Sequence, residues 1–144
     1  MKKIIFVCTG NTCRSPMAEG IFNALAEERK WQARARSAGL FVAEPVVSAN
    51  SAAVMREQGI DISGHIPMQI TDEIIREADL LLTMTDSHKR QLLRGGVSPD
   101  KVGTLAEFAG EAGDVPDPYG GSIEVYRSTA REIKRLLEKI TCFK

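Results

Sequence analysis

The sequence lacks an excess of either charge, an apolar run of the roughly 20 residues that a membrane-spanning helix needs, and a cysteine framework. Its 19 basic and 19 acidic side chains cancel, so no overall field favours nucleic acid or an anionic membrane. Three cysteines are an odd number, which argues against a disulfide scaffold. The apolar run at the N-terminus ends at Cys8, too early for the core of a secretory signal. We therefore expect a monomeric cytoplasmic protein with neither nucleic acid nor membrane as a partner.

The length of 144 residues and an apolar content of 43% are typical of one α/β domain spanning residues 1–144. Short apolar or alternating runs predict strands, and patterns of helical period follow them. The first and third strands are almost wholly apolar, as in parallel strands covered on both faces, whereas the second alternates like an edge strand. The expected strands are 4–7, 33–37, 80–83 and 101–105, and the expected helices are 17–28, 48–58, 71–78, 86–94 and 126–140.

This alternation predicts parallel strands joined by right-handed crossovers. In such sheets, ligands bind beyond the carboxyl ends of the strands. The segments that leave those ends are 8–16, 38–48, 84–88 and 106–121, and they contain most of the chemically reactive side chains.

The segment from Cys8 to Pro16 has the pattern of an anion-binding loop between a strand and a helix. Arg14 follows Cys8 after five intervening residues, and backbone N–H groups of so tight a loop point inward, toward a tetrahedral dianion such as phosphate. Gly10 permits backbone angles that other residues resist, and Asn11 tolerates left-handed geometry. The spacing alone is common by chance, but its position after the first strand favours a functional loop. The residues expected to bind the anion are Thr9, Gly10, Asn11, Thr12, Cys13, Arg14 and Ser15.

The same loop could activate a nucleophile. A helix N-terminus and the Arg14 guanidinium stabilise a Cys8 thiolate, and the Ser15 hydroxyl could donate a hydrogen bond to the sulfur. Ser15 is also expected to cap the helix, with Pro16 at its first position. Cys13 is a candidate redox partner that could trap oxidised Cys8 as a disulfide, and a packed or idle cysteine is the alternative.

A cysteine-phosphate intermediate requires a proton donor for the leaving group, and Asp117 is the best candidate. Pro116 and Pro118 stiffen its loop and lower the cost of holding the carboxyl over the nucleophile. Tyr119 could form a wall beside it. Asp114 is the nearest competitor but lacks flanking prolines.

Together these segments resemble the low-molecular-weight protein tyrosine phosphatase family. The resemblance rests on residues 7–19 and 117–119, with support from 37–39, 59–61 and 79–85, and covers essentially the whole chain. It implies a three-layer fold, in which helices flank both faces of a four-stranded parallel sheet. It also implies a cysteine-dependent protein phosphatase that uses no metal and no cofactor.

In this family the residue matching Cys8 attacks phosphorus, that matching Arg14 binds the phosphoryl group, and that matching Asp117 acts as acid and then base. The resemblance further implies that Asn11 and Ser37 brace the loop by hydrogen bonds. His65 is a third candidate brace, or else a partly exposed loop histidine.

Thr12 departs from the family pattern, because tyrosine phosphatases usually carry isoleucine or leucine there. A threonine resembles the bacterial branch that removes phosphate from arginine in proteins. Asp117 would then also pair with the substrate guanidinium, and Phe41 and Tyr119 could stack on its two faces. We therefore predict phosphoarginine as the substrate, with phosphotyrosine as the alternative.

Two other functions and a zinc site are less compatible with the sequence. Arsenate reductases share the fold, but residues 80–96 contain no cysteine for their relay, and Cys142 lies near the C-terminus. A non-catalytic phosphoresidue-binding module would need neither Cys8 nor Asp117. Zinc is disfavoured because no second pair of ligands has suitable spacing beside Cys8 and Cys13.

Overall fold

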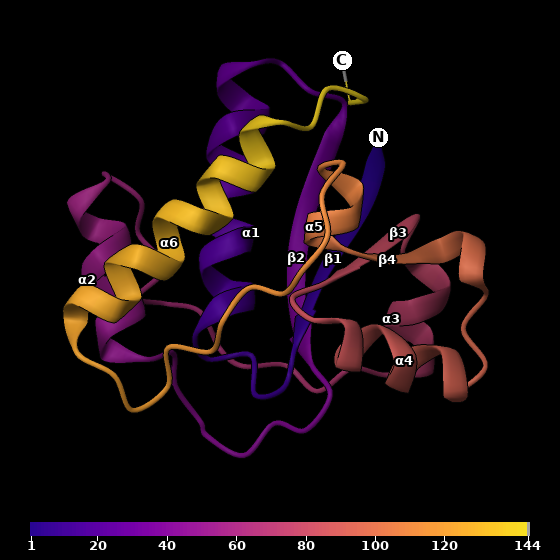
Figure 1. The fold of residues 1–144 in the computed structure, drawn as a ribbon, viewed down its shortest axis with the longest axis horizontal. Helices are drawn as coiled ribbons and strands as arrows, with labels where there is room; N and C mark the ends of the chain where they lie inside the picture. Colours follow the sequence, from indigo (N-terminus) through magenta and orange to yellow (C-terminus); the bar gives the residue numbers. More distant parts are fainter. Residues whose placement is uncertain (144) are drawn as a thin grey trace.

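The structure, a computed structural model that describes residues 1–143, contains a sheet of four parallel strands. The strands lie in the order β2-β1-β3-β4 (Figure 1). The predicted strands are confirmed, and the alternating strand does lie at an edge. Their bounds are β1 Lys2–Cys8, β2 Ala33–Gly39, β3 Leu80–Thr83 and β4 Val102–Thr104.

Helices cover both faces of this sheet (Figure 1), as the three-layer prediction required. One layer contains α1 (Arg14–Glu28), α2 (Ala49–Glu57) and α6 (Ile123–Glu138), and the other contains α3 (Asp72–Glu77) and α4 (Asp86–Arg94). Two shorter elements flank β4: a 3-10 turn at Pro99–Lys101 and α5 at Leu105–Phe108.

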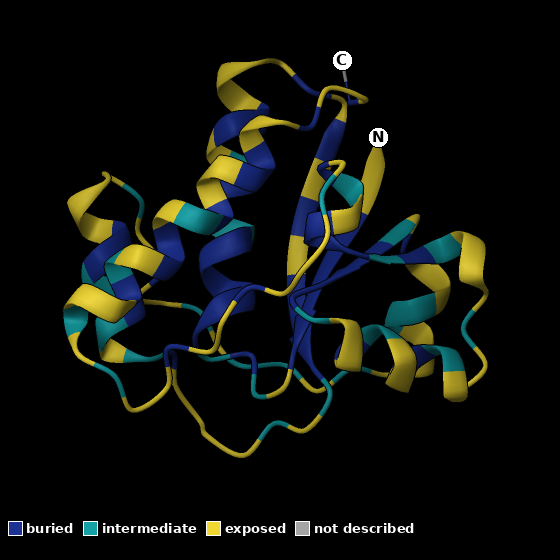
Figure 2. Cartoon of the chain, in the orientation of Figure 1, coloured by how far each residue is buried: buried dark blue, intermediate teal, exposed yellow. Residues whose placement is uncertain are grey.

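Side chains of β1 divide between the two cores because successive residues of a strand point to opposite faces. Ile4, Phe6 and Cys8 pack in the core under α1 and α6, whereas Ile5 and Val7 pack in the core under α3 and α4. Figure 2 shows β1 as a buried strand through most of its length. Cys8 therefore ends a strand whose two faces are both covered by helices.

The chain after β4 differs from its prediction. Leu105 starts α5 instead of ending a strand. The Thr104 side chain accepts the Glu107 N–H at 3.0 Å, and the Glu107 carboxylate accepts the Thr104 N–H at 2.9 Å. This reciprocal capping box was present in the sequence but was hidden by the apolar run.

The start of α1 also differs from its prediction. The helix begins at Arg14, Cys13 occupies the N-cap position, and no side chain caps it. Ser15 therefore lies inside the helix, and Pro16 is its third residue. The prediction that Ser15 caps the helix is wrong, because its hydroxyl bonds to other groups of the loop.

Within residues 1–143, none of the helices combines the length and the apolar character needed to cross a membrane.

Gly39 lets the end of β2 lie close against the loop between β1 and α1. It pairs with Cys8 in the strand register, and a Cβ atom there would lie 2.7 Å from the Thr9 carbonyl oxygen. The next two residues extend this contact, because Leu40 N–H donates to the Cys8 carbonyl at 3.0 Å and Phe41 N–H donates to that of Thr9 at 2.9 Å. Only a residue without a side chain fits this approach.

We expect Gly39→Ala to lower the free energy of unfolding by about 1–3 kcal/mol, because the added methyl group meets backbone. Gly64→Ala is the matched control, since no atom lies within 4 Å of its added Cβ. Urea unfolding of both variants measures the difference. Equal stability of the two would contradict the proposed close contact.

Candidate active site

The loop between β1 and α1 forms the floor of a cleft of about 280 Å³ at the carboxyl end of the sheet. Most of the predicted loop residues line it, together with Phe41 and Glu44 from the segment after β2. Asp117 and Tyr119 complete the wall from the segment before α6. The structure thus brings together the sequence-predicted nucleophile, arginine, acid and aromatic wall.

Asn11 is the central brace of the loop. It is fully buried and has a φ of 56°, the left-handed geometry predicted for it, whereas Gly10 has no positive φ. Its side-chain oxygen accepts hydrogen bonds from the Met68 N–H at 2.9 Å and from His65 Nε2 at 3.0 Å. His65 thus contacts the loop as predicted.

This arrangement fixes the direction of the next hydrogen bonds. Asn11 Nδ2 donates to Ser15 Oγ at 2.8 Å, so the Ser15 hydroxyl proton is free for Cys8 Sγ, which lies 2.8 Å away. Because Ser15 donates to the sulfur, it stabilises negative charge there. Cys8 is only 3% exposed, so this donor acts where water is largely excluded.

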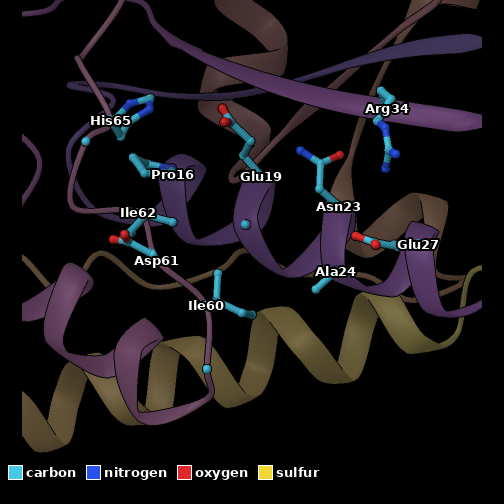
Figure 3. Close-up of a pocket in the computed structure, with 13 residues that line it drawn as sticks. Pro16, Glu19, Asn23, Ala24, Glu27, Arg34, Ile60, Asp61, Ile62 and His65 are labelled. Atoms are coloured by element: carbon cyan, nitrogen blue, oxygen red, sulfur yellow. The ribbon is translucent and has the colours of Figure 1, made fainter.

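Ser37 does not brace the loop, contrary to the prediction. Its buried hydroxyl donates to Glu19 Oε1 at 2.7 Å, and so connects β2 to α1. Glu19 and His65 also line a separate polar groove of about 770 Å³ between α1, the edge of β2 and residues 59–65 (Figure 3). The contribution of Ser37 is therefore to the placement of α1.

Arg14 is held by the segment that carries the candidate acid. Its guanidinium is buried, with Nη1 donating to the Val115 carbonyl at 3.0 Å and Nη2 lying 3.7 Å from Asp117 Oδ2. Val115 is itself fixed, because its N–H donates to the Met84 carbonyl after β3. The arginine fork is thereby oriented before any anion binds.

The two aspartates of this segment have different surroundings. Asp117 lines the cleft with its side chain 54% exposed, and its Oδ1 accepts the Tyr119 N–H at 3.1 Å. Asp114 instead accepts the Asp86 N–H at 2.8 Å at the start of α4 and does not line the cleft. The geometry therefore favours Asp117 over its competitor.

Thr12 lines the cleft, and Phe41 and Tyr119 stand at its rim, each 73% exposed.

Cys13 is a buried free cysteine whose sulfur lies 3.5 Å from the Tyr126 hydroxyl. Burial raises the pKa of Tyr126, so this hydroxyl keeps its proton and can donate it to the sulfur. The formation of a disulfide between oxidised Cys8 and Cys13 stays a prediction. Across residues 1–143, His, Cys, Asp and Glu side chains form no group of three or more suited to a metal ion.

Sequence reasoning missed the environment of His88. The residue is 4% exposed, and its Nε2 lies 2.9 Å from Thr9 Oγ1 in the loop. Burial, followed by the nearby Arg14 guanidinium, lowers the pKa of His88 to about 4, although Asp114 and Asp117 oppose this shift. The only sequence signal was its place in a segment that leaves the carboxyl end of a strand.

The low pKa of His88 predicts a loss of stability in acid. An unfolded histidine, with a pKa near 6.5, binds a proton well above the pH of about 4 at which folded His88 binds one. The free energy of unfolding should therefore fall as the pH drops through this window. His88 should account for about 2 kcal/mol of the loss between about pH 7 and about pH 5. Urea unfolding of the unmodified protein and of His88→Gln at both pH values measures it. An identical pH dependence in the two proteins would exclude this role.

Comparison with known proteins agrees with the site. The family model for low molecular weight phosphotyrosine protein phosphatase matches residues 3–142. A protein-arginine-phosphatase of Bacillus subtilis (strain 168) is 45% identical over 141 residues, which cover 95% of this chain and 93% of the relative. The low molecular weight protein-tyrosine-phosphatase PtpB of Staphylococcus haemolyticus is 39% identical over 139 residues, 96% of each chain.

Solved structures show the same fold. A low molecular weight protein tyrosine phosphatase from T. tengcongensis superposes with a TM-score of 0.92 at 45% identity, covering 96% of this chain and 97% of the other. A mutant of the YwlE arginine phosphatase with a phosphorylated active site serine has a TM-score of 0.91 at 41% identity, covering 95% and 91%. The resemblance inferred from the sequence is confirmed: the chain belongs to the low molecular weight phosphotyrosine protein phosphatase family.

Proposed function

We propose that the protein is a cysteine-dependent phosphatase that removes phosphate from arginine residues of proteins. The observation that carries the chemistry is the 2.8 Å contact between Ser15 Oγ and Cys8 Sγ, inside a loop that also holds Arg14. The observation that carries the substrate is Thr12 in the cleft wall, beside a half-exposed carboxylate. Relatives named as protein-arginine-phosphatases support both.

In the first step, the Cys8 thiolate attacks phosphorus in line with the leaving group. Arg14 binds two of the three phosphoryl oxygens, and the loop N–H groups bind all three as charge develops. Asp117 gives its proton to the leaving guanidine nitrogen as the phosphorus–nitrogen bond breaks. The product of this step is a phosphocysteine at position 8.

In the second step, water hydrolyses the phosphocysteine. The Asp117 carboxylate takes a proton from the water, whose oxygen bonds to phosphorus while the sulfur–phosphorus bond breaks. The departing thiolate receives the Ser15 hydrogen bond. Phosphate then leaves, and Asp117 is again protonated.

The cleft wall favours a guanidinium over a phenol ring. An aliphatic side chain at position 12 would pack on a phenol, whereas the Thr12 hydroxyl offers a polar contact. The carbonyl oxygen of the protonated Asp117 carboxyl group can accept an N–H of the guanidinium, and Phe41 and Tyr119 can stack on the flat faces of the guanidinium. The same aromatic rim would also accept phosphotyrosine, which remains the alternative.

We further propose that residues 1–144 act as one catalytic domain, monomeric and cytoplasmic, on phosphorylated proteins. The balanced charge supports partners other than nucleic acid or membranes. Cys13 would protect the nucleophile by forming a disulfide with it after oxidation.

Thr12→Ile tests the substrate proposal. We expect kcat/KM for a phosphoarginine peptide to fall about tenfold relative to that for the matching phosphotyrosine peptide, because the hydroxyl is replaced by an aliphatic arm. Thr12→Val is the control of nearly equal volume. Steady-state phosphate release on both peptides measures the ratio; a ratio that Thr12→Ile leaves unchanged would remove the basis for phosphoarginine.

A further inference from the structure

The buried His88 ring has no part in the steps proposed above, yet it touches the loop. It belongs to the first turn of α4, and its Nε2 lies 2.9 Å from the hydroxyl of Thr9, the residue after the nucleophile. Its other ring nitrogen, Nδ1, is buried without a hydrogen-bond partner. Because only one of the two ring nitrogens has a hydrogen-bond partner, the position of the ring proton is restricted.

Two neutral forms of the ring differ in their cost. With the proton on Nδ1, a buried N–H donor has no acceptor, and Nε2 must accept from Thr9. With the proton on Nε2, the ring donates to Thr9 Oγ1, and the unsatisfied atom Nδ1 is an acceptor and not an N–H donor. Orphaned buried N–H donors are the rarer case, so the second form is favoured.

A donor at His88 determines what the Thr9 hydroxyl can do. Its oxygen already accepts one hydrogen bond from the ring, so its own proton is available to another acceptor. Thr9 is an exposed residue that lines the cleft beside Cys8 and Arg14. A phosphoryl group bound in the cleft would bring oxygen acceptors to this hydroxyl.

The opposite side of the loop has the same polarity. His65 Nε2 lies between two oxygens of Asn11, at 3.0 and 3.2 Å, and so must donate. Asn11 then donates to Ser15, which donates to Cys8. Two histidines thus donate toward the loop from two directions, and each leaves a hydroxyl proton for the reacting centre.

We propose that His88 is a positioning residue: its Nε2–H bond to Thr9 Oγ1 directs the Thr9 hydroxyl proton to a non-bridging oxygen of the substrate phosphoryl group. This inference rests on the proposed phosphatase function. It does not depend on the choice of substrate, because phosphoarginine and phosphotyrosine carry the same non-bridging oxygens.

A double-mutant cycle tests the proposal. We expect Thr9→Val and His88→Leu each to lower kcat/KM about tenfold on both peptides, the usual effect of one lost hydrogen bond to a charged group. The double variant should be no slower than Thr9→Val alone, since His88 acts through Thr9. His88→Gln, which can place an N–H near the same point, should stay within about threefold of the unmodified protein.

Inhibition by inorganic phosphate gives a readout that a purely structural role would not move. Its inhibition constant should rise by the same factor as kcat/KM falls in Thr9→Val and His88→Leu, and return in His88→Gln. Losses that multiply in the double variant, or full activity of Thr9→Val, would overturn the proposal. If His88→Leu does not fold, Thr9→Val still tests the hydroxyl, and the position of the His88 ring proton tests the donor.

The ring proton can also be located without turnover. Long-range proton–nitrogen NMR spectra of the intact protein at neutral pH should show His88 protonated on Nε2, with the resonance assigned by its loss in His88→Gln. Protonation on Nδ1 would overturn the inference. A protein that hydrolyses neither peptide but shows the Nε2–H form would instead refute the proposed function, and the phosphate titration would then decide the role of Thr9.

Discussion

Negative charge on a buried sulfur must be compensated by nearby donors, and the arrangement of the loop between β1 and α1 follows from this constraint. Asn11 donates to the Ser15 oxygen, which leaves the Ser15 proton directed at Cys8. Asn11 in turn is fixed by His65 and by the Met68 N–H. The hydrogen bond that the nucleophile receives thus depends on residues more than fifty positions away in the chain.

The sheet supplies the rigid frame for these contacts. β1 lies inside the sheet and brings Cys8 to its carboxyl end, where Gly39 lets β2 approach the loop closely. Val115 reaches the same end from the segment before α6, and its carbonyl orients Arg14. The loop that carries Cys8 and Arg14 and the segment that carries Asp117 therefore come from different parts of the chain but share one support.

Local signals predicted much of this site. The Cys8-to-Arg14 spacing, the prolines around Asp117 and the strand pattern all act within a few residues, so they can be read from the sequence. Hydrogen-bond partners that lie far apart in the chain cannot be read from the sequence in this way. The bond from Ser37 to Glu19 depends on how β2 meets α1, and the burial of His88 depends on the packing of α4 against the loop. Ser15 was misassigned as a cap because its hydroxyl bonds to Cys8 and Asn11, and the loop geometry that brings these groups together cannot be read from the sequence.

The central claim is that Cys8 forms the covalent intermediate, and Cys8→Ser tests it most directly. A poorer leaving group at position 8 should accept the phosphoryl group without releasing it. After incubation of this variant with a phosphoarginine peptide, mass spectrometry should find one stable phosphoryl group at position 8 and no sustained phosphate release. Continued turnover by Cys8→Ser, or a phosphoryl group on another residue, would contradict the account.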